Sequence, residues 1–162
     1  MTPFRKTLVA HAAKLATAIA SLTAAVPALA DITVGISLPL TGPASGLGIP
    51  MANFFKLFPA TIAGEKLNVI ILDDATDPTK GVQNAKRFVT EDKVDLIIGS
   101  AATPVAGPMA AVAAESGTVQ LAASPVGLPP GGDAWTFRLP QSNDVMAHAM
   151  VNLMKKQGIK TI

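Results

Sequence analysis

The sequence contains no cysteine among its 162 residues, which excludes disulfide bonds and thiolate metal sites. Of its two histidines, only His148 lies beyond residue 30, in a stretch of helical periodicity with no obvious serine partner. The G-x-S-x-G motif of the α/β-hydrolases does not occur either. Because no nucleophile–base pair is recognisable, we expect a protein that is not an enzyme.

A surplus of positive charge is also missing once the first 30 residues are set aside. The whole chain carries 13 Lys and Arg against 11 Asp and Glu. Arg5, Lys6 and Lys14 lie in the first segment, which has no acidic residue, so the remainder has ten basic and eleven acidic residues and a net charge of −1. Such a domain lacks the electrostatic signature of nucleic-acid binding.

The first 30 residues have the layout of a secretory signal. A basic segment, Met1–Lys14, is followed by the almost wholly apolar run Leu15–Leu29 and by small residues ending at Ala30. A membrane helix is the alternative, but the run is short for a bilayer and Pro27 lies near its end. We therefore predict cleavage after Ala30, a mature chain that starts at Asp31, and a periplasmic location.

Apolar runs and helical patterns alternate along the remainder of the chain. Several of the runs are continuous, as expected for strands of a parallel sheet that is covered on both faces. The alternation predicts an α/β fold with a doubly wound parallel sheet and right-handed crossovers. The predicted strands are Ile32–Leu38, Leu67–Leu72, Val94–Ile98, Val119–Ala122 and Thr136–Leu139.

The predicted helices differ in how clearly their ends are marked. One begins after Asp77, a capping residue followed by a proline. A second ends at Gly117, but either Thr103-Pro104 or Gly107-Pro108 could start it. A third is predicted within 143–157, and a weaker pattern over 49–63 is interrupted by Pro59.

Two motifs suggest chemistry that the rest of the sequence does not support. The glycine-rich segment 41–48 contains part of a dinucleotide fingerprint, but Met51 replaces its third glycine. It is either a loop that needs positive φ angles or a backbone anion site. Residues 73–77 match DDxxD, yet Asp77 is needed as a helix cap and no second acidic cluster accompanies the motif. We expect neither a cofactor nor a metal.

Polar residues also follow the third and fourth predicted strands, at the edge where ligands bind to such sheets. Thr103 could bind a carboxylate at a helix N-terminus, cap that helix, or do both. Ser124 follows the fourth strand and either faces the same crevice or belongs to an ordinary proline-rich turn.

Taken in order, these segments resemble the type I periplasmic solute-binding proteins of ABC transporters, in the branched-chain amino-acid (Leu/Ile/Val) group. The similarity covers nearly all of the chain after residue 30. The segments that carry it are ITVGISLPLTGP, VIILDDATDP, KVDLIIGSAATP, VQLAASP and FRLP.

The resemblance implies two α/β lobes that close on a small solute and deliver it to a membrane permease. It implies that Thr103 binds the carboxylate of an amino acid or a related compound, and that the Ser124 carbonyl accepts from its ammonium group. Val126 stands where amino-acid binders have threonine, so it keeps the backbone N–H but lacks the hydroxyl. Leu47 stands where an aromatic residue often packs on the ligand.

Members of this family are more than twice as long as the chain, so it resembles an N-terminal fragment. On this interpretation residues 1–30 are the signal peptide, residues 31–140 an incomplete first lobe, and residues 141–162 the crossover helix and the start of the second lobe. Two alternatives stay open: a periplasmic ligand-sensing domain of the same fold, and a fragment of a secreted α/β enzyme.

Overall fold

The computed structural model of the chain describes residues 31–128, 134–159 and 161. The predicted signal segment and its cleavage site at Ala30 lie outside the described residues. The strands are β1 (Ile32–Leu38), β2 (Thr61–Ile62), β3 (Glu65–Asp73), β4 (Leu96–Gly99), β5 (Val119–Ala122) and β6 (Thr136–Arg138), and the helices are α2 (Ser45–Phe55), α3 (Pro78–Thr90), α4 (Thr103–Ser116) and α5 (Asn143–Lys156).

The strands form one sheet in the order β2-β3-β1-β4-β5-β6. All pairs are parallel except the short β2, which is antiparallel to β3. From β1 the chain moves first to β3 on one side and later to β4 on the other. The predicted doubly wound parallel sheet is thus confirmed, and β2 is a strand that the sequence did not predict.

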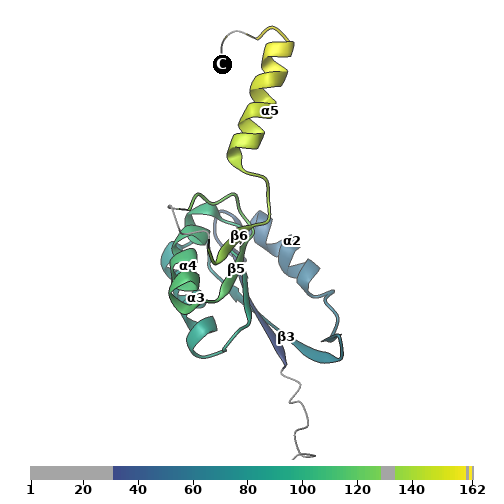
Figure 1. Cartoon of the computed structure of the whole chain (residues 1–162), viewed down its shortest axis with the longest axis vertical. Coiled ribbons are helices and arrows are strands. Elements are labelled where there is room, and N and C mark those ends of the chain that lie inside the picture. The colour runs from purple at the N-terminus through teal and green to yellow at the C-terminus, as the bar shows by residue number, and fades with distance from the viewer. Residues whose placement is uncertain (1–30, 129–133, 160, 162) are drawn as a thin grey trace, which may run out of the picture. The chain divides into compact units, whose positions relative to one another are not determined.

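The two faces of the sheet have separate hydrophobic cores. Helix α2 covers one face, where Phe55 packs with Ile36 and Leu38 of β1. Helices α3 and α4 cover the other face (Figure 1). There Phe88 packs with Ile97 of β4. Alternate residues of the central strands therefore point to opposite cores, which explains why these strands read as continuous apolar runs.

Glycines on β1 and β4 allow close approach in this core. A Cβ atom on Gly35 of β1 would lie 2.6 Å from the ring of Phe88. A Cβ atom on Gly99, which has a φ of 114°, would lie 1.9 Å from the Ser37 carbonyl oxygen. Larger residues at either position would displace β1 from its neighbours.

The starts of α2 and α4 can be compared with the sequence prediction. The start of α2 differs from it, and the start of α4 decides between the two predicted positions. Helix α2 begins at Ser45, inside the segment that we predicted as a glycine-rich loop, and it contains Pro50. Of the residues in that loop, Gly42 does have a positive φ of 80°. Helix α4 begins at Thr103 rather than at Pro108, and Gly117 ends it in the left-handed conformation as predicted.

Helix α5 lies at the predicted position and has no buried residue. The Ser142 hydroxyl oxygen caps it by accepting a hydrogen bond from the Val145 N–H. The helix packs on neither face of the sheet (Figure 1). Within the described part of the chain, no helix has the length and apolar character that are needed to cross a membrane.

Candidate functional site at the carboxyl edge of the sheet

The parallel strands bring four connecting loops to one edge of the sheet. The loops start after β1, β3, β4 and β5 and contain residues 39–44, 74–77, 100–102 and 123–127. The helices leave β1 and β4 on opposite faces, so the chain reverses its winding direction between these two adjacent strands. In open α/β sheets a ligand crevice forms outside the strand ends at such a point.

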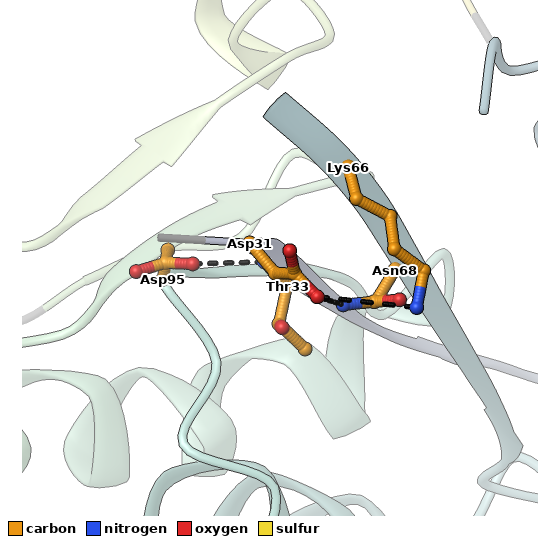
Figure 2. Close-up of polar contacts among 5 residues, drawn as sticks. All are labelled: Asp31, Thr33, Lys66, Asn68 and Asp95. Carbon is orange, nitrogen blue, oxygen red and sulfur yellow. Dashed lines mark hydrogen bonds and ion pairs between the residues drawn. The ribbon is translucent and has the colours of Figure 1, made fainter. Parts of the chain in front are cut away.

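The opposite, amino edge of the sheet is closed by polar contacts (Figure 2). Asp95 accepts a hydrogen bond from the Thr33 N–H at 2.8 Å, which ties β4 to β1. Asp31 accepts one from the Asn68 side chain at 3.3 Å and lies 3.9 Å from the Lys66 ammonium group. These contacts link the starts of the three central strands at the surface.

At the carboxyl edge, Asp73 joins the loop after β1 to the loop after β3. Its carboxylate accepts hydrogen bonds from the backbone N–H groups of Leu40, Thr41 and Ala75 at 2.8, 3.1 and 2.8 Å. The Thr41 hydroxyl donates a fourth at 2.6 Å. Desolvation by itself would raise the pKa of Asp73, but these hydrogen bonds outweigh it and lower the pKa. Asp73 is therefore ionised and holds the loops after β1 and β3 together through these hydrogen bonds.

Asp74 points to the interior and is fully buried. It accepts hydrogen bonds from the Ser37 hydroxyl at 3.3 Å and from the Thr76 N–H at 3.0 Å. Desolvation raises the pKa of Asp74, with a smaller contribution from the charge of Asp73, and the neighbouring polar groups of Ser100, Thr76 and Ser37 offset only part of this increase.

The carboxylates of the DDxxD motif are therefore occupied by N–H and O–H donors. Asp77 caps α3 as predicted, by accepting hydrogen bonds from the Thr79 and Lys80 N–H groups at 2.7 and 3.3 Å. Hydrogen bonds from these two N–H groups lower the pKa of Asp77. Within residues 31–128 and 134–159, no group of three metal-ligating side chains is close enough to hold an ion.

Thr103 is the first residue of α4 and is exposed at this edge. The alternative in which Thr103 caps the helix is wrong, because Ala102 is the N-cap residue and no side chain caps the helix. The Ala102 carbonyl accepts from the N–H groups of Val105 and Ala106, both at 3.0 Å. Among the described residues neither the N–H nor the hydroxyl of Thr103 has a hydrogen-bond partner, so both can bind an anion at the positive end of the helix dipole.

Ser124 and Val126 follow β5, the strand next to β4. The Ser124 carbonyl accepts a hydrogen bond from the Val126 N–H at 2.8 Å, so the two backbone groups that the resemblance assigns to a ligand are bonded to each other. The Val126 side chain is 3% exposed and packs against Ala106 and Ala122. The Ser124 hydroxyl is buried and has no hydrogen-bond partner among the described residues. A buried hydroxyl of this kind needs a ligand or a water molecule.

Leu47 lies in the first turn of α2 and is 58% exposed. Since α2 covers the face opposite to α4, Leu47 approaches the carboxyl edge from the other side of the sheet than Thr103. The four predicted residues thus follow β1, β4 and β5, three neighbouring strands, at a single edge.

The sequence did not predict two polar residues near this edge. The Arg138 guanidinium group donates a hydrogen bond to the Val126 carbonyl at 3.3 Å, which supports the turn after β5. Gln120 is fully buried, donates to the carbonyls of Gly99 and Ala106 at 2.8 and 3.2 Å, and accepts from the Thr136 hydroxyl at 3.0 Å. Gln120 was recognisable as the polar residue inside the apolar run VQLA.

A family model described as periplasmic binding protein matches residues 31–162. The chain belongs to the periplasmic binding protein family. It is 31% identical over 147 residues to a Leu/Ile/Val-binding protein homolog of Brucella melitensis biotype 1, an alignment that covers 83% of the chain and 40% of that relative.

Solved structures of this family share the fold. An extracellular ligand-binding receptor from Rhodopseudomonas palustris matches 80% of the chain with a TM-score of 0.77 and 40% identity. A solute-binding protein of an ABC transporter from Rhodopseudomonas palustris, solved with 3,4-dihydroxybenzoic acid, matches 80% of it with a TM-score of 0.71 and 25% identity. The chain covers only 36% and 37% of these two structures.

Proposed function

We propose that the chain is part of an extracytoplasmic solute-binding component of an ABC importer. Its ligand would be a branched-chain amino acid or a related small carboxylate, bound without covalent chemistry. The names of the relatives support this proposal, since one is a Leu/Ile/Val-binding protein homolog and another a solute-binding protein of an ABC transporter. Export through a signal peptide cleaved after Ala30 would place the protein in the periplasm, where it would meet the permease.

The observation that carries the proposal is the position of Thr103. Thr103 is an exposed residue at the N-terminus of α4, a helix of 14 residues, beside the point where the sheet reverses its winding direction. A carboxylate there would accept two hydrogen bonds and interact favourably with the helix dipole. Asp77 caps the N-terminus of α3 with its own carboxylate. The N-terminus of α3 is therefore not available to bind an anion.

The polar groups of Ser124 fit carboxylate ligands with an ammonium group, such as amino acids, and also carboxylate ligands without one. Its carbonyl already accepts one hydrogen bond but retains a second lone pair, which could accept from an ammonium group. Its buried hydroxyl could serve a ligand that has no such group. The relative solved with 3,4-dihydroxybenzoic acid binds a carboxylate that lacks an ammonium group.

The domain interpretation is part of the same proposal. Residues 31–140 would be the first lobe of a clamshell, and residues 141–162 would lead into a second lobe. The absence of buried residues in α5 supports this interpretation, because a crossover helix need not pack on the first lobe. A periplasmic sensor domain would use the same site but would contact a signalling receptor instead of a permease.

Isothermal titration of the purified chain with leucine tests the proposal, and leucinamide, which lacks the carboxylate, serves as the matched ligand. One lobe leaves its ligand open to water, so we expect weak binding of leucine, with a Kd of about 1 mM. Leucinamide and the variant Thr103→Ala should each weaken binding about tenfold. The variant Thr90→Ala, at the far end of α3, should bind as the wild type does. Equal binding of leucine and leucinamide would contradict the proposal.

A further inference from the structure

Two residues of the loop after β3 have an unusual backbone conformation. Ala75 and Thr76 are consecutive and have φ values of 52° and 61°. Residues other than glycine rarely adopt a positive φ, and for a β-branched residue such as threonine this conformation is an outlier. Backbone strain of this kind persists only where the surrounding contacts favour it. The contacts of Thr76 therefore indicate what the conformation achieves.

The Thr76 hydroxyl joins the two ends of the loop after β1. It accepts a hydrogen bond from the Ala44 N–H at 3.1 Å and donates one to the Thr41 carbonyl at 3.4 Å. Between these two residues, a Cβ atom on Gly42 would lie 2.4 Å from the Ala75 carbonyl oxygen. The loop after β1 is therefore packed directly on the strained backbone of the loop after β3.

The end of the loop after β1 is also the start of α2. Ala44 is the N-cap residue of this helix, and its methyl group cannot accept the hydrogen bond that a capping side chain accepts. The Ala44 carbonyl accepts a hydrogen bond from the Leu47 N–H at 2.9 Å. Two hydrogen bonds thus lead from the Thr76 hydroxyl, through the backbone of Ala44, to Leu47 in the first turn of α2.

We propose that Thr76 is a positioning residue, which holds the N-cap of α2 from the neighbouring loop and thereby fixes Leu47 at the candidate site. Because the N-cap is held from outside the helix, the first turn of α2 needs no polar capping side chain of its own, and an apolar residue can stand there. Thr76 is half-buried between the two loops, and no contact between Thr76 and the ligand is implied. Its effect on ligand binding rests on the function proposed above, whereas the hydrogen-bond path to Leu47 does not.

Hydrogen exchange of the ¹⁵N-labelled chain tests this path without any ligand. In the wild type the Ala44 amide should exchange more slowly than in an unfolded peptide, because it is bonded to the Thr76 hydroxyl. Thr76→Val keeps the shape and the β-branched side chain but cannot accept a hydrogen bond. It should accelerate exchange of the Ala44 and Leu47 amides about tenfold. Thr76→Ser keeps the hydroxyl and should restore slow exchange.

Two controls separate this path from a general loss of structure. The Leu40 amide is bonded to Asp73, at the start of the same loop, and should keep its exchange rate in Thr76→Val. Thr90→Val removes a hydroxyl that donates to the Lys86 carbonyl at the far end of α3. It should leave the exchange of all three amides unchanged.

Leucine binding tests the consequence for the candidate site. If the first turn of α2 is displaced for part of the time, the site is competent only for the remainder, and the apparent Kd rises in proportion. We expect Thr76→Val to raise the Kd for leucine about threefold and Thr76→Ser to restore the wild-type value.

The proposal is overturned if the wild-type Ala44 amide exchanges as fast as in an unfolded peptide, a result that depends on no variant. It is also overturned if Thr76→Val leaves the Ala44 and Leu47 amides unchanged, or if the Leu40 amide is accelerated with them. Equal leucine binding by the wild type and Thr76→Val would show that Thr76 has no role at the site. If no form of the chain binds leucine, the proposed function fails while the exchange result stands, so the two proposals can fail separately.

Discussion

Strands β1, β3 and β4 lie between helices on both faces of the sheet, whereas β6 and α5 leave most of their apolar side chains in contact with solvent. Phe88 of α3 is fully buried, but Phe137 of β6 is 55% exposed. In α5 the exposed apolar side chains are Val145, Met146, Met150, Val151 and Leu153. The free energy of folding therefore comes mainly from residues 31–122, and the later elements add little to it.

The largest expected difference between the two regions comes from one substitution made in both. Phe88→Ala removes a ring that packs against Gly35 and Ile97, and we expect it to lower the free energy of unfolding by about 3–5 kcal/mol. Phe137→Ala should change it by about 0.5 kcal/mol at most. Urea unfolding followed by circular dichroism measures both. Equal losses would show that β6 is as well packed as the central strands.

Gln120 lies at the boundary between the two regions and provides the next test. The variant Gln120→Leu keeps the volume but leaves the Thr136 hydroxyl without the acceptor that it uses now. The carbonyls of Gly99 and Ala106 lose a donor as well. We expect a loss of about 1–3 kcal/mol in the same assay. Gln83→Leu, at an exposed position of α3, is the control and should have almost no effect.

Asp73 and Asp74 should give opposite pH dependences of stability. The pKa of Asp73 lies below its ordinary value of 3.8, so its contribution is complete above pH 3.8 and is lost as the pH falls through the lowered pKa. The pKa of Asp74 lies above 3.8, so its contribution is complete below pH 3.8 and is lost as the pH rises through the raised pKa.

Urea unfolding midpoints measured below and above pH 3.8 test the two opposite pH dependences. Asp73→Asn should reduce the loss of stability on acidification, and Asp74→Asn should reduce the loss that accompanies rising pH above 3.8. Identical pH profiles for the two variants would mean that the neighbouring carboxyl groups are not held in the different environments that the structure shows.

The smallest effect is expected from removal of α5. A chain that ends at Pro140 loses no buried residue of that helix, so its free energy of unfolding should change by about 0.5 kcal/mol at most. Light scattering should also show less self-association, since several exposed apolar side chains are removed. A clear loss of stability would show that α5 packs on the sheet in solution.

The same contrast explains how much of the fold the sequence predicted. The central strands were recognisable because covering on both faces makes them continuous apolar runs, and α3 because Asp77 and Pro78 mark its start. The start of α2 was not, because Gly46, Gly48 and Pro50 resemble a loop, although the weaker helical pattern over 49–63 overlaps the helix from residue 49 onward. Its start depends instead on tertiary contact: a Cβ atom on Gly48 would lie 2.2 Å from the Pro39 carbonyl oxygen.

For the candidate site, the sequence predicted which loops form it but not the hydrogen bonds within and between these loops. Thr103, Ser124, Val126 and Leu47 follow strands whose carboxyl ends lie at one edge, which parallel pairing made predictable, and their role in ligand binding stays a prediction. The hydrogen bond between Asp74 and Ser37 could not be predicted, because it depends on the register of β3 against β1. The hydrogen bond between Ser124 and Val126 likewise depends on the backbone conformation of a turn that the sequence leaves open.

The central claim is that a carboxylate binds at the N-terminus of α4, and its location can be measured directly. Added leucine should shift the amide resonances of Thr103 and Ser124 of the ¹⁵N-labelled chain more than those of other residues. The groove of about 400 Å³ between the C-terminal halves of α3 and α4, lined in part by Lys86 and Glu115, should be unaffected. Shifts concentrated in that groove, with Thr103 unchanged, would contradict the account.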